Sequence, residues 1–188
     1  MHFFTIAYSK FVIPMKKTIL LLILLFFIQN LVAQQNEKQC PCCSESYNSF
    51  DFWIGDWTVY DVNGKVIGNN RIEKQYDNCV LQEKWTSKEK SRGTSYNYYD
   101  KKEGTWNQIW IDNSGFSLVL KGNYSDGRMV LKSELINGQK GPYYNQITWV
   151  KNTDGSVTQI WDIFDEKNKK TQEAFRGIYK KSVKTDEK

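Results

Sequence analysis

The chain has 188 residues, a length that suits one domain and leaves no room for two sizeable ones. Apolar residues make up 40% and aromatic residues 15% of it, so the composition excludes disordered and collagen-like proteins. The 26 Lys and Arg residues outnumber the 21 Asp and Glu residues, which gives a formal net charge of +5.

The N-terminal segment, residues 1–33, has the pattern of a secretory signal peptide. A Lys pair at 16–17 precedes ten consecutive apolar residues, Ile19 to Ile28, and Ala33 supplies the small residue for cleavage. The apolar run is too short to span a bilayer, although an uncleaved N-terminal anchor is the alternative. Residues 1–14 have the character of an upstream extension. We therefore expect a periplasmic or secreted protein without a transmembrane span after cleavage.

Cleavage after Ala33 changes the charge and removes the only histidine. Residues 1–33 hold three Lys and no acid, so 23 basic and 21 acidic residues remain, with a net charge of +2. No basic patch remains, and nucleic acid is not an expected partner. The loss of His2 excludes Ser-His-Asp and Cys-His catalysis, His-ligated haem and zinc sites that contain His. No cofactor is expected.

Four cysteines, Cys40, Cys42, Cys43 and Cys79, follow the cleavage point, and four cysteines in an exported chain indicate two disulfides. Adjacent cysteines rarely bond to each other. We therefore expect Cys42 or Cys43 to bridge to Cys79, which would tie the Cys-rich segment 34–49 to the sheet, and the second bridge to involve Cys40. The alternative is a soft-metal site for Cu(I) or Zn in the Cys-Pro-Cys-Cys run.

From residue 50 onward, regular turn signals separate segments rich in β-branched and aromatic residues. Asn-Gly and Asp-Gly pairs favour tight hairpins, so neighbouring strands are expected to pair antiparallel. The expected strands are 52–61, 66–76, 79–88, 93–100, 105–112, 116–124, 128–136, 143–151, 156–165 and 171–181. Closure of this meander would remove its exposed edges. The sequence therefore predicts an all-β, up-and-down antiparallel barrel of about ten strands over 50–181, followed by a polar tail at 182–188.

Alternation within the strands indicates what would line such a barrel. In 105–112, one face carries Trp106, Gln108, Trp110 and Asp112, and four other strands have faces that combine aromatic with amide, hydroxyl or carboxyl side chains. If these faces point inward, the lumen is neither an aliphatic core nor a charged pore. The candidate ligand-binding residues are Glu83, Trp85, Asn97, Tyr99, Trp106, Gln108, Trp110, Trp149, Gln159 and Trp161.

Two interpretations of the inward amides remain open. Burying an unpaired amide costs about 1–3 kcal/mol, so the amides need mutual pairing, ordered water or a ligand. One interpretation is a packed aromatic core whose amides bond to each other. The other is a ligand cavity, which a ring of ten strands favours because it encloses more space than side chains easily fill.

Several motifs resemble an exported bacterial family, domain of unknown function 1579, whose members look lipocalin-like. The opening motif is FDFWIGDW at 50–57, and the others are NCVLQEKW at 78–85, GTSYNYYD at 93–100, WNQIWIDNSG at 106–115, DGRMVL at 126–131, ITW at 147–149 and DGSV at 154–157. The resemblance covers about 43–180 and implies the barrel fold without an activity. It also implies a bridge from Cys42 or Cys43 to Cys79, whereas Cys40 departs from the family pattern.

Gly55-Asp56-Trp57 also resembles the lipocalin G-x-W on the first strand, whose Trp packs under an Arg of the last strand. By this resemblance Arg176 is expected to stack on Trp57 and close one end of the barrel, an interaction of about 0.5–2 kcal/mol. This role is structural.

Three functions are compatible with these observations. The favoured one is an exported barrel that binds a small hydrophobic or aromatic molecule. The second is a non-catalytic cell-envelope or interaction module with a solid aromatic core. The third is a hydrolase that uses Glu83 as general base, with Asp112, Tyr99 and Lys84 as further candidates.

Overall fold

The computed structural model describes residues 40–182, so the predicted signal peptide at 1–33 and the end of the polar tail lie outside the described residues. Two short helical segments come first, α2 (Glu45–Asn48) and the 3-10 helix η1 (Asp51–Trp53). The strands are β1 (Gly55–Tyr60), β2 (Val66–Gln75), β3 (Val80–Ser87), β4 (Arg92–Asp100), β5 (Thr105–Asp112), β6 (Ser117–Ser125), β7 (Arg128–Lys132), β8 (Ile136–Gly138), β9 (Gly141–Lys151), β10 (Val157–Asp165) and β11 (Lys170–Lys181).

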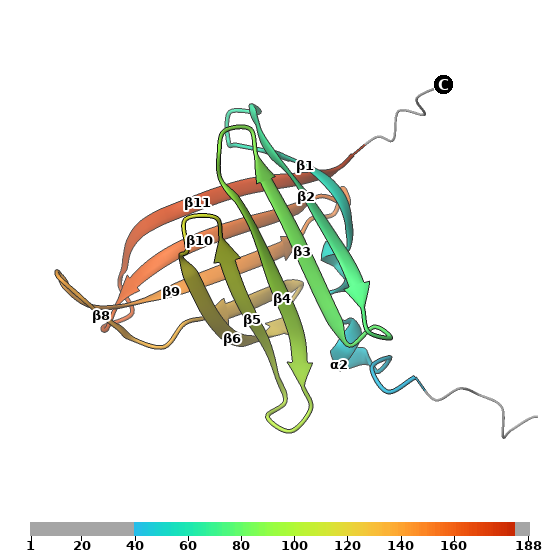
Figure 1. The fold of residues 1–188 in the computed structure, drawn as a ribbon. Helices are drawn as coiled ribbons and strands as arrows, with labels where there is room; N and C mark the ends of the chain where they lie inside the picture. The colour runs from blue at the N-terminus through green and yellow to red at the C-terminus, as the bar shows by residue number, and fades with distance from the viewer. Residues whose placement is uncertain (1–39, 183–188) are drawn as a thin grey trace, which may run out of the picture. The chain divides into compact units, whose positions relative to one another are not determined.

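The strands form a closed antiparallel barrel, which confirms the predicted fold class. Each strand from β1 to β6 pairs with the next, β7 pairs with β9, and β9, β10 and β11 continue the meander. Pairing of β11 with β1 closes a ring of ten strands, and β8 lies outside this ring as a short hairpin arm on β9. In Figure 1, β3 to β5 form the wall nearest the viewer, and β9 to β11 pass behind them.

Tight turns set the pairing register of the meander. Asp126 and Gly127 have φ angles of 51° and 77° and join β6 to β7 through the pair Ser125–Arg128. Positive φ at both central residues is the geometry that Asp-Gly tolerates and that matches the twist of a two-residue hairpin. The turn therefore places alternate residues of β6 and β7 on the same face of the wall.

The structure corrects the predicted strands at two places. Residues 52–54 do not extend β1, because the N–H groups of Trp53 and Ile54 bond to the carbonyls of Phe50 and Asp51 and form the η1 turn. The predicted strand 128–136 ends at Lys132. Ser133 Oγ accepts the Asn145 N–H at 2.9 Å and donates to the carbonyl of Glu134, which replaces the regular ladder before β8.

The N-terminal helical segments plug one end of the barrel. Phe50 and Trp53 are fully buried and stack on each other with ring centroids 5.0 Å apart. Phe50 also meets Trp106 and Trp149 edge-on, at 5.5 and 5.1 Å. The indole N–H of Trp106 donates to Ser49 Oγ at 2.9 Å. We call Phe50, Trp53, Trp106 and Trp149 the plug cluster.

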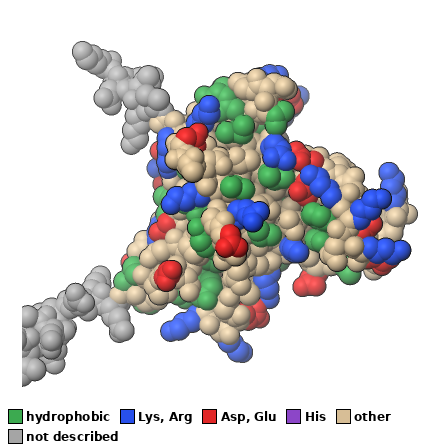
Figure 2. Space-filling model, turned by 180° about the vertical axis from the view of Figure 1, so that it is seen from behind, with side chains coloured by type: hydrophobic (Ala, Val, Ile, Leu, Met, Phe, Trp, Pro, Cys, Tyr) green, Lys and Arg blue, Asp and Glu red, His purple; other side chains and the backbone are tan. Residues whose placement is uncertain are grey.

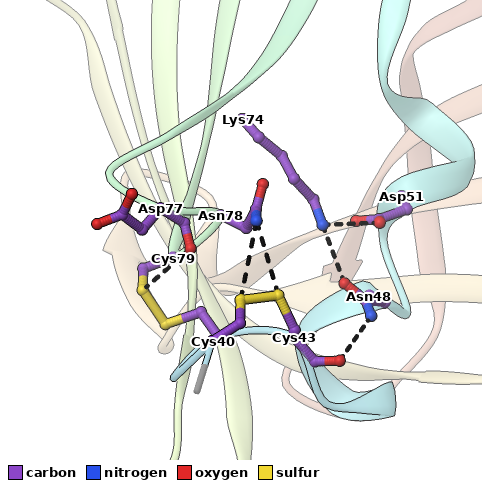
Figure 3. The surroundings of a disulfide bond; sticks show 9 residues. Cys40, Cys43, Asn48, Asp51, Lys74, Asp77, Asn78 and Cys79 are labelled. Atoms are coloured by element: carbon purple, nitrogen blue, oxygen red, sulfur yellow. Dashed lines mark hydrogen bonds and ion pairs between the residues drawn. A yellow bond between two sulfur atoms is a disulfide. The ribbon is translucent and has the colours of Figure 1, made fainter. Parts of the chain in front are cut away.

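Covalent and ionic links hold this plug against the wall. Cys42 is bonded to Cys79, at the start of β3, and Cys40 is bonded to Cys43 (Figure 3). Lys74 Nζ on β2 pairs with Asp51 Oδ2 at 2.7 Å and donates to Asn48 Oδ1 at 2.9 Å. The Cys79 link is the one anticipated from sequence, with Cys42 as its partner.

The surface carries mixed charge on the face that Figure 2 presents, where basic and acidic side chains are interspersed among apolar ones. No helix in residues 40–182 combines the length and the apolar character needed to cross a bilayer.

Lys181, rather than Arg176, covers Trp57. Lys181 Nζ lies 3.8 Å from the centre of the Trp57 ring and donates to the carbonyl of Ile54. Strand alternation explains the error, because Tyr179 and Lys181 share the inward parity of β11, whereas Arg176 has the opposite parity and pairs with Glu173. The expected cation–π contact therefore exists with a different cation.

Lys181→Ala should destabilise the protein by about 1 kcal/mol, because it removes a cation–π contact and a hydrogen bond to a carbonyl. The matched variant Arg176→Ala removes only a surface ion pair and should cost less than about 0.5 kcal/mol. Urea unfolding followed by tryptophan fluorescence measures both. Equal losses for the two variants would contradict the assignment of Lys181.

Candidate functional site

The end of the barrel opposite the plug holds a cavity of about 260 Å³. Its floor consists of buried side chains, among them Glu83, Gln108 and Tyr179, and its rim includes the exposed residues Phe116 and Ala174. The full lining is Glu83, Trp85, Ser91, Gln108, Trp110, Asp112, Phe116, Leu118, Ile147, Gln159, Trp161, Ala174, Phe175 and Tyr179. The cavity is therefore a cup with a buried floor and a solvent-accessible mouth.

Aromatic rings form much of the wall of this cup. Phe116 and Trp161 stack with ring centroids 6.2 Å apart, and Trp85 meets Phe175 edge-on at 6.3 Å. Trp110 belongs to the same lining. Rings arranged in this way present apolar faces to any planar molecule that enters the cup.

Glycines on neighbouring strands keep two of these indoles against the wall. A Cβ at Gly68 on β2 would overlap the ring of Trp85 on β3, and a Cβ at Gly93 on β4 would overlap the ring of Trp110 on β5. Because glycine has no side chain, each indole lies over the backbone of the adjacent strand. The lumen beside these rings stays open for this reason.

A connected polar layer separates the cup from the plug cluster. Glu83 accepts hydrogen bonds from Asn70 Nδ2 at 2.7 Å and from Ser95 Oγ at 2.6 Å. Ser95 Oγ accepts from Asn97 Nδ2 at 2.9 Å, and Asn97 Oδ1 accepts from Gln108 Nε2 at 2.7 Å. The predicted inward amides thus pair with one another, as buried polar groups must.

Two floor groups complete this layer. The phenol of Tyr179 donates to Gln159 Oε1. The side-chain hydrogen bonds of the two floor glutamines within residues 40–182 use Gln159 Oε1 and Gln108 Nε2, which leaves Gln159 Nε2 and Gln108 Oε1 unpaired there. The floor therefore presents one free amide donor and one free amide acceptor beside the cup.

Burial sets the protonation of the floor. It raises the pKa of Glu83 to about 7, although the hydrogen bonds from Ser95 and Asn70 act in the opposite direction. Burial also raises the pKa of Tyr179 well above its usual value, and the nearby Glu83 carboxylate adds to this rise. Near neutral pH the Glu83 carboxyl is therefore present in both its neutral and its anionic form.

The structure distributes the ten predicted site residues among the cup, the polar layer and the plugged end of the barrel. Glu83, Trp85, Gln108, Trp110, Gln159 and Trp161 line the cup. Asn97 lies in the polar layer beneath it, and Trp149 lies in the plug cluster. Tyr99 and Trp106 line a separate, shallower hollow of about 210 Å³ beside α2. All ten residues belong to inward faces of their strands, but the plug occupies the lumen around Trp149, Tyr99 and Trp106.

Sequence reasoning missed several lining residues, chiefly Phe116, Phe175 and Tyr179. Phe175 and Tyr179 share the inward parity of β11, a signal that could have identified both. Phe116 directly precedes β6 and was not singled out. Its contact with Trp161 depends on closure of the barrel, and no local pattern indicates it.

The other candidate catalytic residues do not gather around Glu83. Lys84 points to the outer face, where its Nζ pairs with Glu73. Asp112 lies in the lining, but its Oδ1 accepts hydrogen bonds from the backbone and side chain of Ser114 and from the backbone of Phe116. These bonds, led by that of the Ser114 hydroxyl, lower the pKa of Asp112. Of the two carboxyls that line the cup, the pKa of Glu83 is raised to about 7 and the pKa of Asp112 is lowered.

Comparison of the chain with protein-family models and with curated proteins found no match.

The free energy of unfolding should fall as the pH rises from about 4.5 to about 7. Glu83 in the unfolded chain loses its proton near pH 4.5, whereas folded Glu83 keeps it up to about pH 7, so the folded state binds the extra proton in this window. The pKa shift of Glu83 changes the free energy of unfolding by at most ~3 kcal/mol across this window.

Glu83→Gln should flatten this dependence, because the amide does not titrate. Chemical denaturation at pH 4.5, 6 and 8 would measure it. The lowered pKa of Asp112 and of Asp154 affects stability only below this window, so these groups do not obscure the comparison. An unchanged slope in the variant would mean that Glu83 is not the group responsible.

Proposed function

We propose that this protein is an exported barrel that binds a small planar molecule in the cup. The observation that carries the proposal is a cavity of about 260 Å³ with aromatic walls, a polar floor and a solvent-accessible mouth. Pockets for drug-sized ligands span ~300–1,000 Å³. The volume of this cup therefore suits a ligand of one or two rings rather than a long lipid or an extended chain.

The lining specifies the chemistry of this ligand. Indole and phenyl faces of Trp85, Trp110 and Phe175 stack on planar rings, a contact worth ~0.5–1.5 kcal/mol beyond the buried area. Gln108 Oε1 and Gln159 Nε2 offer one acceptor and one donor at the floor. A planar aromatic ring with an uncharged amide or lactam edge satisfies both amides.

Charge at the floor selects against anions. Glu83 lies in the lining beside Gln108, and above pH 7 it is increasingly ionised. A ligand carboxylate would then meet a buried carboxylate in a region of low dielectric. The ligand is therefore uncharged or carries a positive edge.

Export and family membership form part of the same proposal. Two disulfides are typical of oxidising compartments and support a periplasmic or secreted location. We propose assignment to the domain of unknown function 1579 on the motifs at 50–57 and 106–115, and the closed antiparallel barrel is compatible with it.

Benzamide should bind in the cup more tightly than benzoate, which has nearly the same shape but carries a negative charge. Binding of so small a probe is expected near ~1 mM. At pH 8, titration of isotope-labelled protein would follow the indole N–H resonances by NMR. Benzamide should shift those of Trp85, Trp110 and Trp161 and leave those of Trp53, Trp57 and Trp149 in place, because only the first three line the cup.

Two variants test the position of the probe. Gly93→Ala should push the Trp110 ring into the lumen and weaken binding at least about tenfold. Ala174→Trp should obstruct the mouth from an exposed rim position, whereas Val119→Trp, on the outer face, should leave binding unchanged. Absence of binding by any planar amide, together with no co-purifying molecule in native mass spectrometry of protein from its own host, would favour the packed interaction module instead.

A further inference from the structure

The cysteine cluster at the plugged end contains two disulfides that differ in their surroundings. Cys42 is 5% exposed and its bridge to Cys79 spans 37 positions, from the plug to β3. Cys40 and Cys43 are both exposed, and their bridge spans only three positions. Figure 3 shows the two bridges next to each other beneath the turn that carries Asn78.

The Cys40–Cys43 bridge contributes less to holding the fold than Cys42–Cys79 does. A disulfide stabilises a protein mainly by restricting the unfolded chain, and this effect grows with the length of the closed loop. Closing a loop of three positions restricts the unfolded chain much less than closing one of 37. The plug is also held independently, by Cys42–Cys79 and by the Lys74–Asp51 ion pair. The barrel therefore does not depend on the exposed bridge.

Asn78 places an amide donor at both sulfurs of this bridge. Its Nδ2 lies 3.9 Å from Cys40 Sγ and 3.7 Å from Cys43 Sγ (Figure 3). The residue has a φ of 72° and lies in the turn directly before Cys79. A donor in this position stabilises a thiolate on either cysteine, and the thiolate is the leaving group when such a bridge opens.

We propose that Cys40–Cys43 is a reactive disulfide that exchanges with low-molecular-weight thiols while Cys42–Cys79 remains closed. An incoming thiolate attacks one sulfur and forms a mixed disulfide. The bond between the two cysteine sulfurs breaks, and its electron pair leaves on the other cysteine as a thiolate facing Asn78. A second thiolate attacks the mixed disulfide, so two thiols become one external disulfide and the protein gains a dithiol. This site is independent of the cup.

Timed reduction of the full chain in a buffer of reduced and oxidised glutathione tests this proposal. Free thiols are trapped by alkylation at each time and assigned by peptide mass spectrometry, with circular dichroism recorded in parallel. Cys40 and Cys43 should be alkylated at least about 100-fold faster than Cys42 and Cys79, with the barrel spectrum unchanged. Equal rates for the two bridges, or alkylation that appears only as the barrel unfolds, would overturn the proposal.

Variants separate the role of Asn78 from simple exposure. Asn78→Gly permits the same positive φ but removes the donor, and it should slow exchange by roughly threefold. Asn168→Gly makes the same change at a positive-φ position in the β10–β11 turn and should have no effect. Cys40→Ser with Cys43→Ser should fold with Cys42–Cys79 intact and lose the fast alkylation. Unaltered exchange in Asn78→Gly would refute the assignment of the amide.

Discussion

Burial of the N-terminal aromatic segment inside one end of the barrel is the constraint on which the rest of the structure depends. Phe50 and Trp53 are fully buried, and they pack against inward rings from β5 and β9. A ring of ten strands encloses more space than its own side chains fill. The plug fills this space at one end only, so it decides that the cup lies at the other. Cys42–Cys79 and Lys74–Asp51 keep it in place.

The polar layer makes these two halves chemically different. On the plug side the aromatic rings pack against each other, as in an ordinary core. On the cup side the rings face a cavity, and the layer supplies a floor that contains hydrogen-bonding groups and one titratable carboxyl. Glu83 tolerates burial because Asn70 and Ser95 donate to it, yet burial still dominates its pKa. The same residue therefore links the stability of the barrel to the charge of the proposed site.

The sequence interpretations of a packed aromatic core and an aromatic cavity both apply, each to one half of the lumen. The immediate neighbours of each indole decide which of the two interpretations applies to it. Trp149 and Trp106 meet the plug, whereas Trp85 and Trp110 lie over Gly68 and Gly93 and leave the lumen free. Glycine on an adjacent strand thus decides whether an inward indole fills space or lines it.

The sequence by itself determined the barrel, the order of its ten ring strands, the limits of eight of them to within two residues and the inward faces, because a period of two and Asp-Gly turns are local properties of the chain. It did not indicate the short strand β8. It also identified six residues of the cup. Only the tertiary structure decided which inward residues meet the plug and which line the cup. It likewise decided that Lys181 covers Trp57 and that Phe116 stacks on Trp161. These contacts join residues far apart in the chain, and their geometry depends on the register in which the ring closes and on where the N-terminal segment inserts.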